Sequence, residues 1–236
     1  MAKPANTDAP PVVVLLGVVH GDPEGEGRLG KWLHAVQPRI ITVEISPFSV
    51  RYRGRAQAYW RRLWEKALAQ LPPGAAASLA LARVAAQLEL PFEYRISRKW
   101  AKTQGAALHL VDWAAPARRH LPRYAPELLS PDNLRALWEQ SPRGSLAEFA
   151  TREYRRAQLA LGGKLRRPLP PSPAEVRREA LQAARLRRWA RPGVRLMHIG
   201  GWEHLVPWPD GHGLPHLLAD LNPVTRLLVE DPGERD

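Results

Sequence analysis

The stretch that decides the fold is Pro11–Gly17, PVVVLLG. Its unbroken run of β-branched and other apolar residues predicts a strand that is buried on both faces. After a turn rich in Gly, Asp and Pro, Gly27–Gln37 has the apolar spacing of a helix, and Pro38 ends it. The next run, Arg39–Glu44 (RIITVE), predicts a second strand. A strand-helix-strand unit with a right-handed crossover makes its two strands parallel.

The same alternation of strands and helices continues along the chain. Three further strands are predicted at Ala106–Asp112 (AALHLVD), Val194–Ile199 (VRLMHI) and Thr225–Glu230 (TRLLVE). We therefore expect an α/β fold with three α/β/α layers and a mostly parallel central sheet of about five strands. One domain spans 1–236, with a helical insertion around 47–104 and another around 116–173.

The composition excludes several classes of protein. Of the 236 residues, 44% are hydrophobic, which is enough for a substantial core, and none is cysteine. Disulfide scaffolds, thiolate zinc sites, iron-sulfur clusters and cysteine nucleophiles are therefore excluded. Any metal ion must be held by His, Asp or Glu.

The net charge of +12 raises the question of nucleic-acid binding. The basic residues are mostly arginines with acids interspersed, in two helical clusters: Arg51, Arg53, Arg55, Arg61 and Arg62, and Arg177, Arg178, Arg185, Arg187 and Arg188. We interpret these clusters as solvated helix faces. No zinc-finger, RNP or helix-turn-helix pattern supports a nucleic-acid partner.

No part of the sequence approaches the roughly 18 consecutive apolar residues of a membrane helix. The short apolar run near the N-terminus is interpreted as a strand and not as a signal peptide. We therefore expect a cytoplasmic protein with no membrane association. The expected partner is a small-molecule or peptide substrate, and the sequence leaves homo-oligomerisation open.

Polar residues follow four of the predicted strands. His20 lies shortly after the first strand, Glu44 ends the second, Asp112 ends the third, and His204 lies shortly after the fourth. Ligands of open α/β sheets bind at the carboxyl ends of the strands. We therefore expect these four side chains to meet at one edge of the sheet.

Both histidines belong to the same pattern, G-x-x-H, with Gly17 before His20 and Gly201 before His204. Glycine allows a chain that leaves a buried strand to turn sharply. Two imidazoles and a carboxylate are a recurring ligand set for Zn²⁺, Mn²⁺, Co²⁺ or Fe²⁺, and a metal lowers the pKa of its bound water toward about 7. Without a metal, His20 would act as a general base that Glu44 orients.

Some of these residues have a structural alternative. Asp112 would equally serve as a cap for the following helix. Glu44 follows a buried run and needs a partner, which favours a site role. We interpret His198, inside the fourth strand, as a core histidine, and Glu203 as a solvated surface acid.

The chain resembles the superfamily of TraB/PrgY pheromone-shutdown proteins, Tiki-type metalloproteases, GumN, ChaN-like haem-binding lipoproteins and erythromycin esterases. The residues that carry the resemblance are Gly17–His20, Ile40–Glu44 and Gly201–His204, with weaker similarity at Gly105–Asp112 and at the Arg178-Glu179 pair. These motifs occur in the expected order and span nearly the whole chain.

The resemblance implies that His20, Glu44 and His204 are the metal-binding or acid-base residues. Asp112, at the end of the third predicted strand, is a further candidate metal ligand. It also implies that Arg178 binds an anionic group or stabilises an oxyanion. The chain departs from lipoprotein relatives because it has no lipobox cysteine, and from Tiki and TraB proteins that carry a membrane segment.

We therefore expect a hydrolase, metal-dependent with Mn²⁺, Zn²⁺ or Co²⁺, that cleaves an amide or ester bond with water activated at the His/Glu/His site. The alternative is a non-enzymatic protein of the ChaN type that binds haem or a small molecule, for which the nine tryptophans would line an apolar pocket. Nucleic-acid binding through the Arg-rich helices is the third hypothesis.

Overall fold

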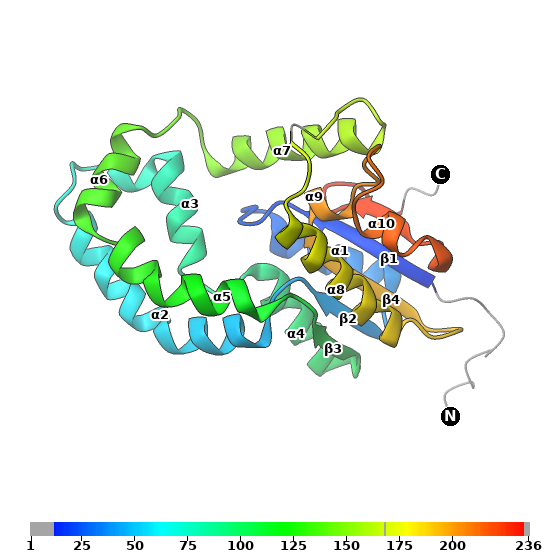
Figure 1. Cartoon of the computed structure of the whole chain (residues 1–236). Coiled ribbons are helices and arrows are strands. Elements are labelled where there is room, and N and C mark those ends of the chain that lie inside the picture. The colour runs from blue at the N-terminus through cyan, green and yellow to red at the C-terminus, as the bar shows by residue number, and fades with distance from the viewer. Residues whose placement is uncertain (1–11, 168, 234–236) are drawn as a thin grey trace.

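The computed structural model describes residues 12–167 and 169–233, and in it five parallel strands form one sheet in the order β3-β2-β4-β1-β5. The strands are β1 (Val12–Val18), β2 (Ile40–Val43), β3 (Ala107–Leu110), β4 (Arg195–Gly201) and β5 (Val224–Leu227). Helices cover the sheet (Figure 1), so the predicted α/β/α class is confirmed. The predicted start of the first strand, Pro11, lies outside the described residues.

Helical segments connect the strands. The α-helices are α1 (Gly25–Val36), α2 (Pro47–Leu68), α3 (Leu79–Gln87), α4 (Phe92–Gln104), α5 (Ala114–His120), α6 (Pro131–Glu139), α7 (Leu146–Leu161), α8 (Pro173–Trp189), α9 (Trp202–Leu205) and α10 (Leu214–Leu217). Short helical turns are η1 (Ala75–Ala77), η2 (Leu121–Arg123), η3 (Tyr124–Leu128) and η4 (Ala219–Leu221).

Strand β1 lies inside the sheet and is buried on both faces, as its continuous apolar run predicts. Val14 and Leu16 contribute to one core cluster, with α1, α4 and α7, whereas Val13 and Leu15 contribute to another, with α8 and α10. Alternate side chains of a strand point to opposite faces. The two clusters are therefore the two interfaces between the sheet and its helical layers.

The helices α2, α3, α5 and α6 form a separate part of the molecule, to the left in Figure 1. It has its own buried cluster, which includes Trp60, Leu81 and Leu134. Helices α4 and α7 fall inside the insertions expected from the sequence, but their buried side chains belong to the core of the sheet. Helix α7 contacts both α3 and β5, so it connects the two parts.

Over the described parts of the chain, 12–167 and 169–233, no helix combines the length and the apolar character needed to cross a bilayer.

Candidate active site

Glu44 lies at the carboxyl edge of the sheet, where its side chain has several hydrogen-bond and ion-pair partners. It follows β2 directly, and its side chain is 2% exposed. The backbone N–H of Gly201 donates to Oε2 over 2.6 Å, while Gln182 Nε2 and Arg178 Nη2 approach Oε1 at 3.2 and 3.1 Å. A buried carboxylate needs such partners, because losing water without replacement costs free energy. The partners come from β4 and α8, so Glu44 joins the sheet edge to the helix.

Arg178 lies between two carboxylates. Its Nε donates to Asp112 Oδ1 over 2.6 Å, in addition to the ion pair with Glu44. Burial lowers the pKa of Arg178, but Asp112 and Glu44 raise it by more, so the group stays cationic. Helix α8 starts with a Ser172–Glu175 capping box, which fixes its first turn.

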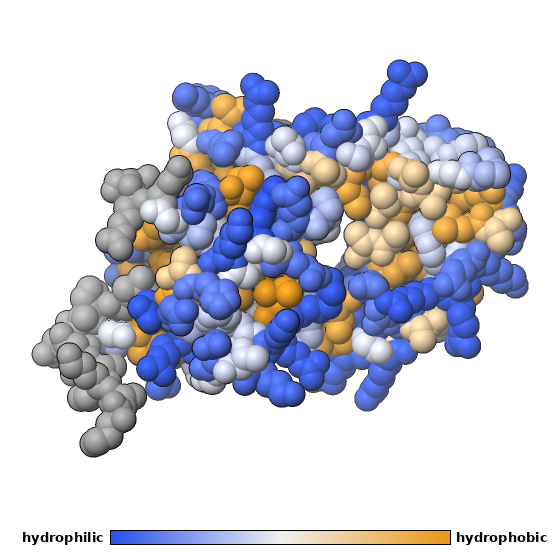
Figure 2. Space-filling view, turned by 180° about the vertical axis from the view of Figure 1, so that it is seen from behind, coloured by the Kyte–Doolittle hydropathy of each residue, from blue (hydrophilic) through white to orange (hydrophobic). Residues whose placement is uncertain are grey.

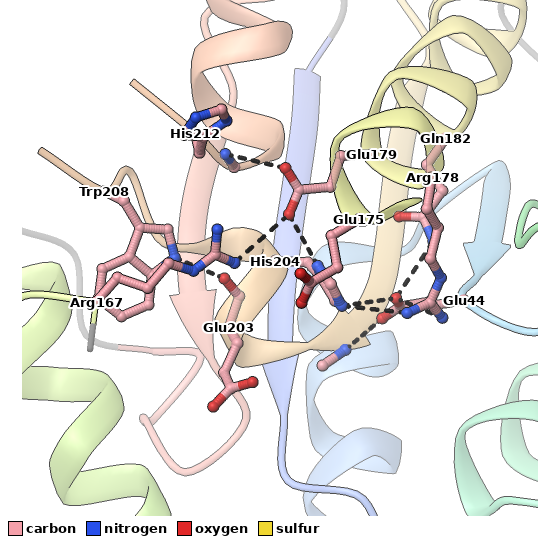
Figure 3. Close-up of polar contacts among 12 residues, drawn as sticks. Glu44, Arg167, Glu175, Arg178, Glu179, Gln182, Glu203, His204, Trp208 and His212 are labelled. Carbon is pink, nitrogen blue, oxygen red and sulfur yellow. Dashed lines mark hydrogen bonds and ion pairs between the residues drawn. The ribbon is translucent and has the colours of Figure 1, made fainter. Parts of the chain in front are cut away.

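His204 lies in the short helix α9, between two glutamates (Figure 3). Its Nδ1 is 2.9 Å from Glu179 Oε1, and its Nε2 is 3.5 Å from Glu44 Oε1 and 3.3 Å from Arg178 Nη1. Burial lowers the pKa of His204, but the charge of Glu44 and the bond to Glu179 outweigh it and raise the pKa. His204 therefore forms part of a buried network of charges.

His20 has a similar partner but a different environment. Its Nδ1 is 2.7 Å from Oε1 of Glu93 on α4, and Glu93 is 3% exposed. The side chain of His20 itself is 62% exposed. Desolvation lowers the pKa of His20, but the hydrogen bond and the charge of Glu93 outweigh it and raise the pKa to about 9. The acid that orients His20 is thus Glu93, and not Glu44 as the sequence suggested.

Glu44 also carries a shifted pKa. Burial raises the pKa of Glu44, but the charges of His204, Arg178 and His20 lower it by more, so that the pKa falls to about 2. Glu44 is therefore an anion at neutral pH.

The two glycines of the G-x-x-H turns hold the histidines close to this carboxylate. A Cβ at Gly201 would lie 3.1 Å from His20 Nε2 and 3.6 Å from Glu44 Oε2, so the glycine keeps open the space that these two groups share. A Cβ at Gly17 would lie 3.0 Å from Leu227 and 3.2 Å from the backbone Cα of Trp202. The first turn therefore packs directly on the second.

A further hydrogen-bond network holds the His20 turn in place. The buried hydroxyl of Tyr154, on α7, accepts a bond from the backbone N–H of Val19 over 3.2 Å and donates to Asp22 Oδ2 over 3.1 Å. Arg28 pairs with the same Asp22 oxygen at 2.8 Å. The residues on both sides of His20 are thus tied to a helix distant in sequence.

A cavity of about 860 Å³ opens over this edge of the sheet. His20, Glu44, Glu93 and Asp112 line it together with residues of α2, α3 and α4. It lies where the sheet meets the separate helical part, and Figure 2 shows the molecule hollowed between these two parts. A cavity of this size accommodates a small organic ligand.

The sequence predicted a metal ion at these residues. Among the residues that the structure describes, no three His, Cys, Asp or Glu side chains form a group able to hold one. The guanidinium of Arg178 lies against Glu44, Asp112 and His204. Arg178 thus supplies positive charge to the donors that the sequence assigned to a metal ion, and the metal site stays a prediction.

Other residues singled out in the sequence lie beside this centre. His198 is fully buried, with Nδ1 3.0 Å from Thr42 Oγ1, and burial lowers its pKa to about 4, so it is a neutral core histidine. Glu203 is exposed, as predicted for a surface acid. Of the second arginine cluster, Arg185 donates to two backbone carbonyls and Arg187 pairs with Asp220.

Three functional residues were not identified from the sequence: Glu93, Glu179 as the partner of His204, and Gln182. Each is a polar residue on the buried face of a helix, next to apolar neighbours at helical spacing such as Trp100 on α4 and Leu186 on α8. An acid or amide on such a face needs a partner. That pattern was the available signal, but it does not say which histidine each acid meets.

In the comparisons with known proteins, the chain matches no protein-family model, no curated protein and no solved structure.

Proposed function

We propose that this protein is a hydrolase that cleaves an ester or amide bond with His20 as the general base. The observation that supports this best is the His20–Glu93 pair: an exposed imidazole that lines the cavity and is held through Nδ1 by a buried carboxylate over 2.7 Å, with Nε2 beside Gly201 and close to Glu44. A histidine held in this way keeps one nitrogen free for proton transfer.

In the proposed reaction, Nε2 of neutral His20 takes a proton from water as the water oxygen attacks the carbonyl carbon. The tetrahedral intermediate then collapses, the bond to the leaving oxygen or nitrogen breaks, and the His20 imidazolium returns the proton to that atom. Glu93 keeps Nδ1 protonated and stabilises the imidazolium. Arg178 and His204 act as positioning residues, because they hold Glu44 and Asp112 in place.

The binding-protein alternative would use the same cavity. Within the described residues, Phe92 is the one Phe, Tyr or Trp side chain that lines it, while many of the other lining groups are charged. Haem and other large flat apolar ligands favour a mostly apolar lining. We therefore propose turnover of a polar substrate as the primary function.

The test is hydrolysis of a panel of aryl acetates and aryl amides by wild type, His20→Ala and His120→Ala. His120 is an exposed histidine outside the cavity and serves as the matched control. We expect His20→Ala to lose about 10²- to 10⁴-fold in kcat while remaining folded, with a Tm lowered by the loss of the partner of Glu93.

The assay is run with chelator and again with added Mn²⁺, Zn²⁺ or Co²⁺. Activity that survives chelation supports the metal-independent reaction described above. Activity that appears only with one of these ions would instead support the metal-dependent form expected from the sequence. Equal turnover by wild type and His20→Ala would overturn the assignment of the base.

A further inference from the structure

The cavity contains more carboxylates than guanidinium groups, yet every one of its carboxylates is already paired. Asp22 pairs with Arg28, Glu93 with His20, and Asp112 with Arg178, at 2.8, 2.7 and 2.6 Å. The remaining pairs are Glu44 with Arg178, Glu26 with Arg95, and Glu89 with Arg61. Each acid of the cavity therefore has at least one basic partner.

Two cavity-lining guanidinium groups have no such partner. Over the part of the chain that the structure describes, neither Arg53 nor Arg83 forms an ion pair with a carboxylate. Arg53 Nη1 donates to the backbone carbonyl of Gln87 over 2.6 Å, and the Arg83 guanidinium lies 4.5 Å from the ring centroid of Phe149. These two guanidinium groups are therefore the cavity-lining cations that no carboxylate of the described chain pairs with.

The two arginines are linked to the same helix. Arg83 is on α3, and Arg53 on α2 donates to the backbone carbonyl of Gln87, four residues after Arg83 on that helix. The two groups belong to the helical wall of the cavity, whereas His20 and Glu44 belong to the edge of the sheet.

Apolar side chains also line the cavity, among them Ala85, Leu90 and Phe92. A ligand that reaches from His20 to the arginines would therefore carry a reactive carbonyl at one end, an apolar middle and an anion at the other end. Guanidinium groups recognise carboxylate and phosphate with paired hydrogen bonds.

We propose that Arg53 and Arg83 bind an anionic group of the substrate, so that this hydrolase acts on esters or amides that also bear a free carboxylate or phosphate. The proposal rests on the hydrolase function proposed above and adds the substrate class to it.

The first test compares matched substrates. Wild type is assayed with 4-acetoxybenzoate and with its neutral methyl ester, and again with the longer 4′-acetoxybiphenyl-4-carboxylate and its methyl ester. We expect kcat/KM to favour the anionic member of at least one pair by about 10-fold or more, and this preference to weaken as salt is added. A preference for both neutral members would overturn the proposal.

The variant Arg83→Gln is expected to remove most of this preference, and Arg53→Gln to act in the same direction. The control is Arg62→Gln, an equal change of net charge at an exposed arginine of α2 that does not line the cavity. If Arg62→Gln lowers the preference as much as Arg83→Gln, the effect comes from overall charge and the proposed subsite is wrong.

A binding measurement separates this proposal from the proposed reaction. Calorimetric titration with 4-hydroxybenzoate, which cannot be hydrolysed, is expected to give binding to wild type and His20→Ala but at least 10-fold weaker binding to Arg83→Gln. Such binding without turnover of any substrate would refute the hydrolase and keep the anion site. Titration with inorganic phosphate shows whether phosphate is recognised as well as carboxylate. Turnover with no dependence of binding on Arg53 or Arg83 would refute the anion site alone.

Discussion

The two G-x-x-H turns have the same local design in different surroundings. In each turn, Nδ1 of the histidine meets a buried glutamate from a helix, Glu93 for His20 and Glu179 for His204. The side chain of His20 is 62% exposed, whereas that of His204 is 15% exposed and lies beside Arg178.

In both turns the Nδ1–glutamate contact orients the imidazole, and the two rings differ in their surroundings. An exposed ring in a cavity exchanges protons with water and substrate. A buried ring between Glu44 and Glu179 holds two carboxylates in place. The proposed division of labour is therefore catalysis by the first turn and support by the second.

The largest expected effect is a difference in stability between variants of the two turns. His204→Ala leaves Glu179 and Glu44 with fewer partners in a buried network, and we expect it to lower the free energy of unfolding by about 3–5 kcal/mol. His20→Ala leaves one buried carboxylate, Glu93, without its partner, and we expect a smaller loss of about 1–3 kcal/mol, because only one carboxylate is affected. Urea unfolding followed by circular dichroism measures both. Equal losses would show that the two histidines have the same structural role.

A second prediction concerns Glu44, which contacts Gly201 and His204 of the second G-x-x-H turn. Its pKa is lowered from 4.5 to about 2 in the folded state, so its ionisation stabilises the fold above pH 4.5. This contribution, on the order of 3 kcal/mol, is lost as the pH falls from 4.5 toward 2. We expect unfolding curves of Glu44→Gln to depend less on pH over this range than those of wild type. Parallel pH dependence in the two proteins would refute the shift.

The third prediction concerns how kcat/KM depends on pH through His20. Because the pKa of His20 is raised to about 9, the neutral base becomes populated as the pH rises, and kcat/KM should increase with a midpoint near pH 9 and level off above it. Glu93→Gln removes the charge that raises this pKa, so the midpoint should move down toward 6.5. The plateau should also fall, because the ring is less well oriented. In Glu179→Gln, by contrast, the midpoint should remain near that of wild type.

The smallest expected effect concerns Tyr154, which supports only the His20 turn. Tyr154→Phe leaves the Val19 N–H and Asp22 without their hydroxyl partner, and we expect a loss of about 1–2 kcal/mol of stability. Activity should fall by a few-fold with the pH midpoint unchanged. The exposed Tyr59→Phe serves as the control. A loss of stability as large as that in His204→Ala would contradict a local role.

Most of the fold followed from the sequence, because the three central strands, β1, β2 and β4, are largely buried and consist mostly of apolar residues. The run at Val194–Ile199 corresponds to β4, and the run at Thr225–Glu230 corresponds to β5. The roles of α4 and α7 did not follow, since an amphipathic pattern shows that a helix has a buried face but not which surface that face meets.

The position of the candidate site was predictable from the sequence, but the partners of its side chains were not. Parallel strands present their carboxyl ends at one edge, and the structure brings His20, Glu44, Asp112 and His204 together there. The partners of the two histidines could not be deduced, because they are set by helix packing: Glu93 is 73 residues from His20 in sequence. The central position of Arg178 between carboxylates also depends on how α8 packs on the sheet.

The contact between the two turns restricts how this protein can evolve. At Gly17, an added methyl group would meet the Cα of Trp202 at 3.2 Å, and a Cα is present whatever residue occupies position 202. A smaller side chain at 202 therefore cannot act as a second-site suppressor of Gly17→Ala. A compensating change would have to shift the main chain between β4 and α9, which also carries the second histidine. Residues of the two G-x-x-H turns are thus expected to change together during evolution, although they lie near opposite ends of the chain.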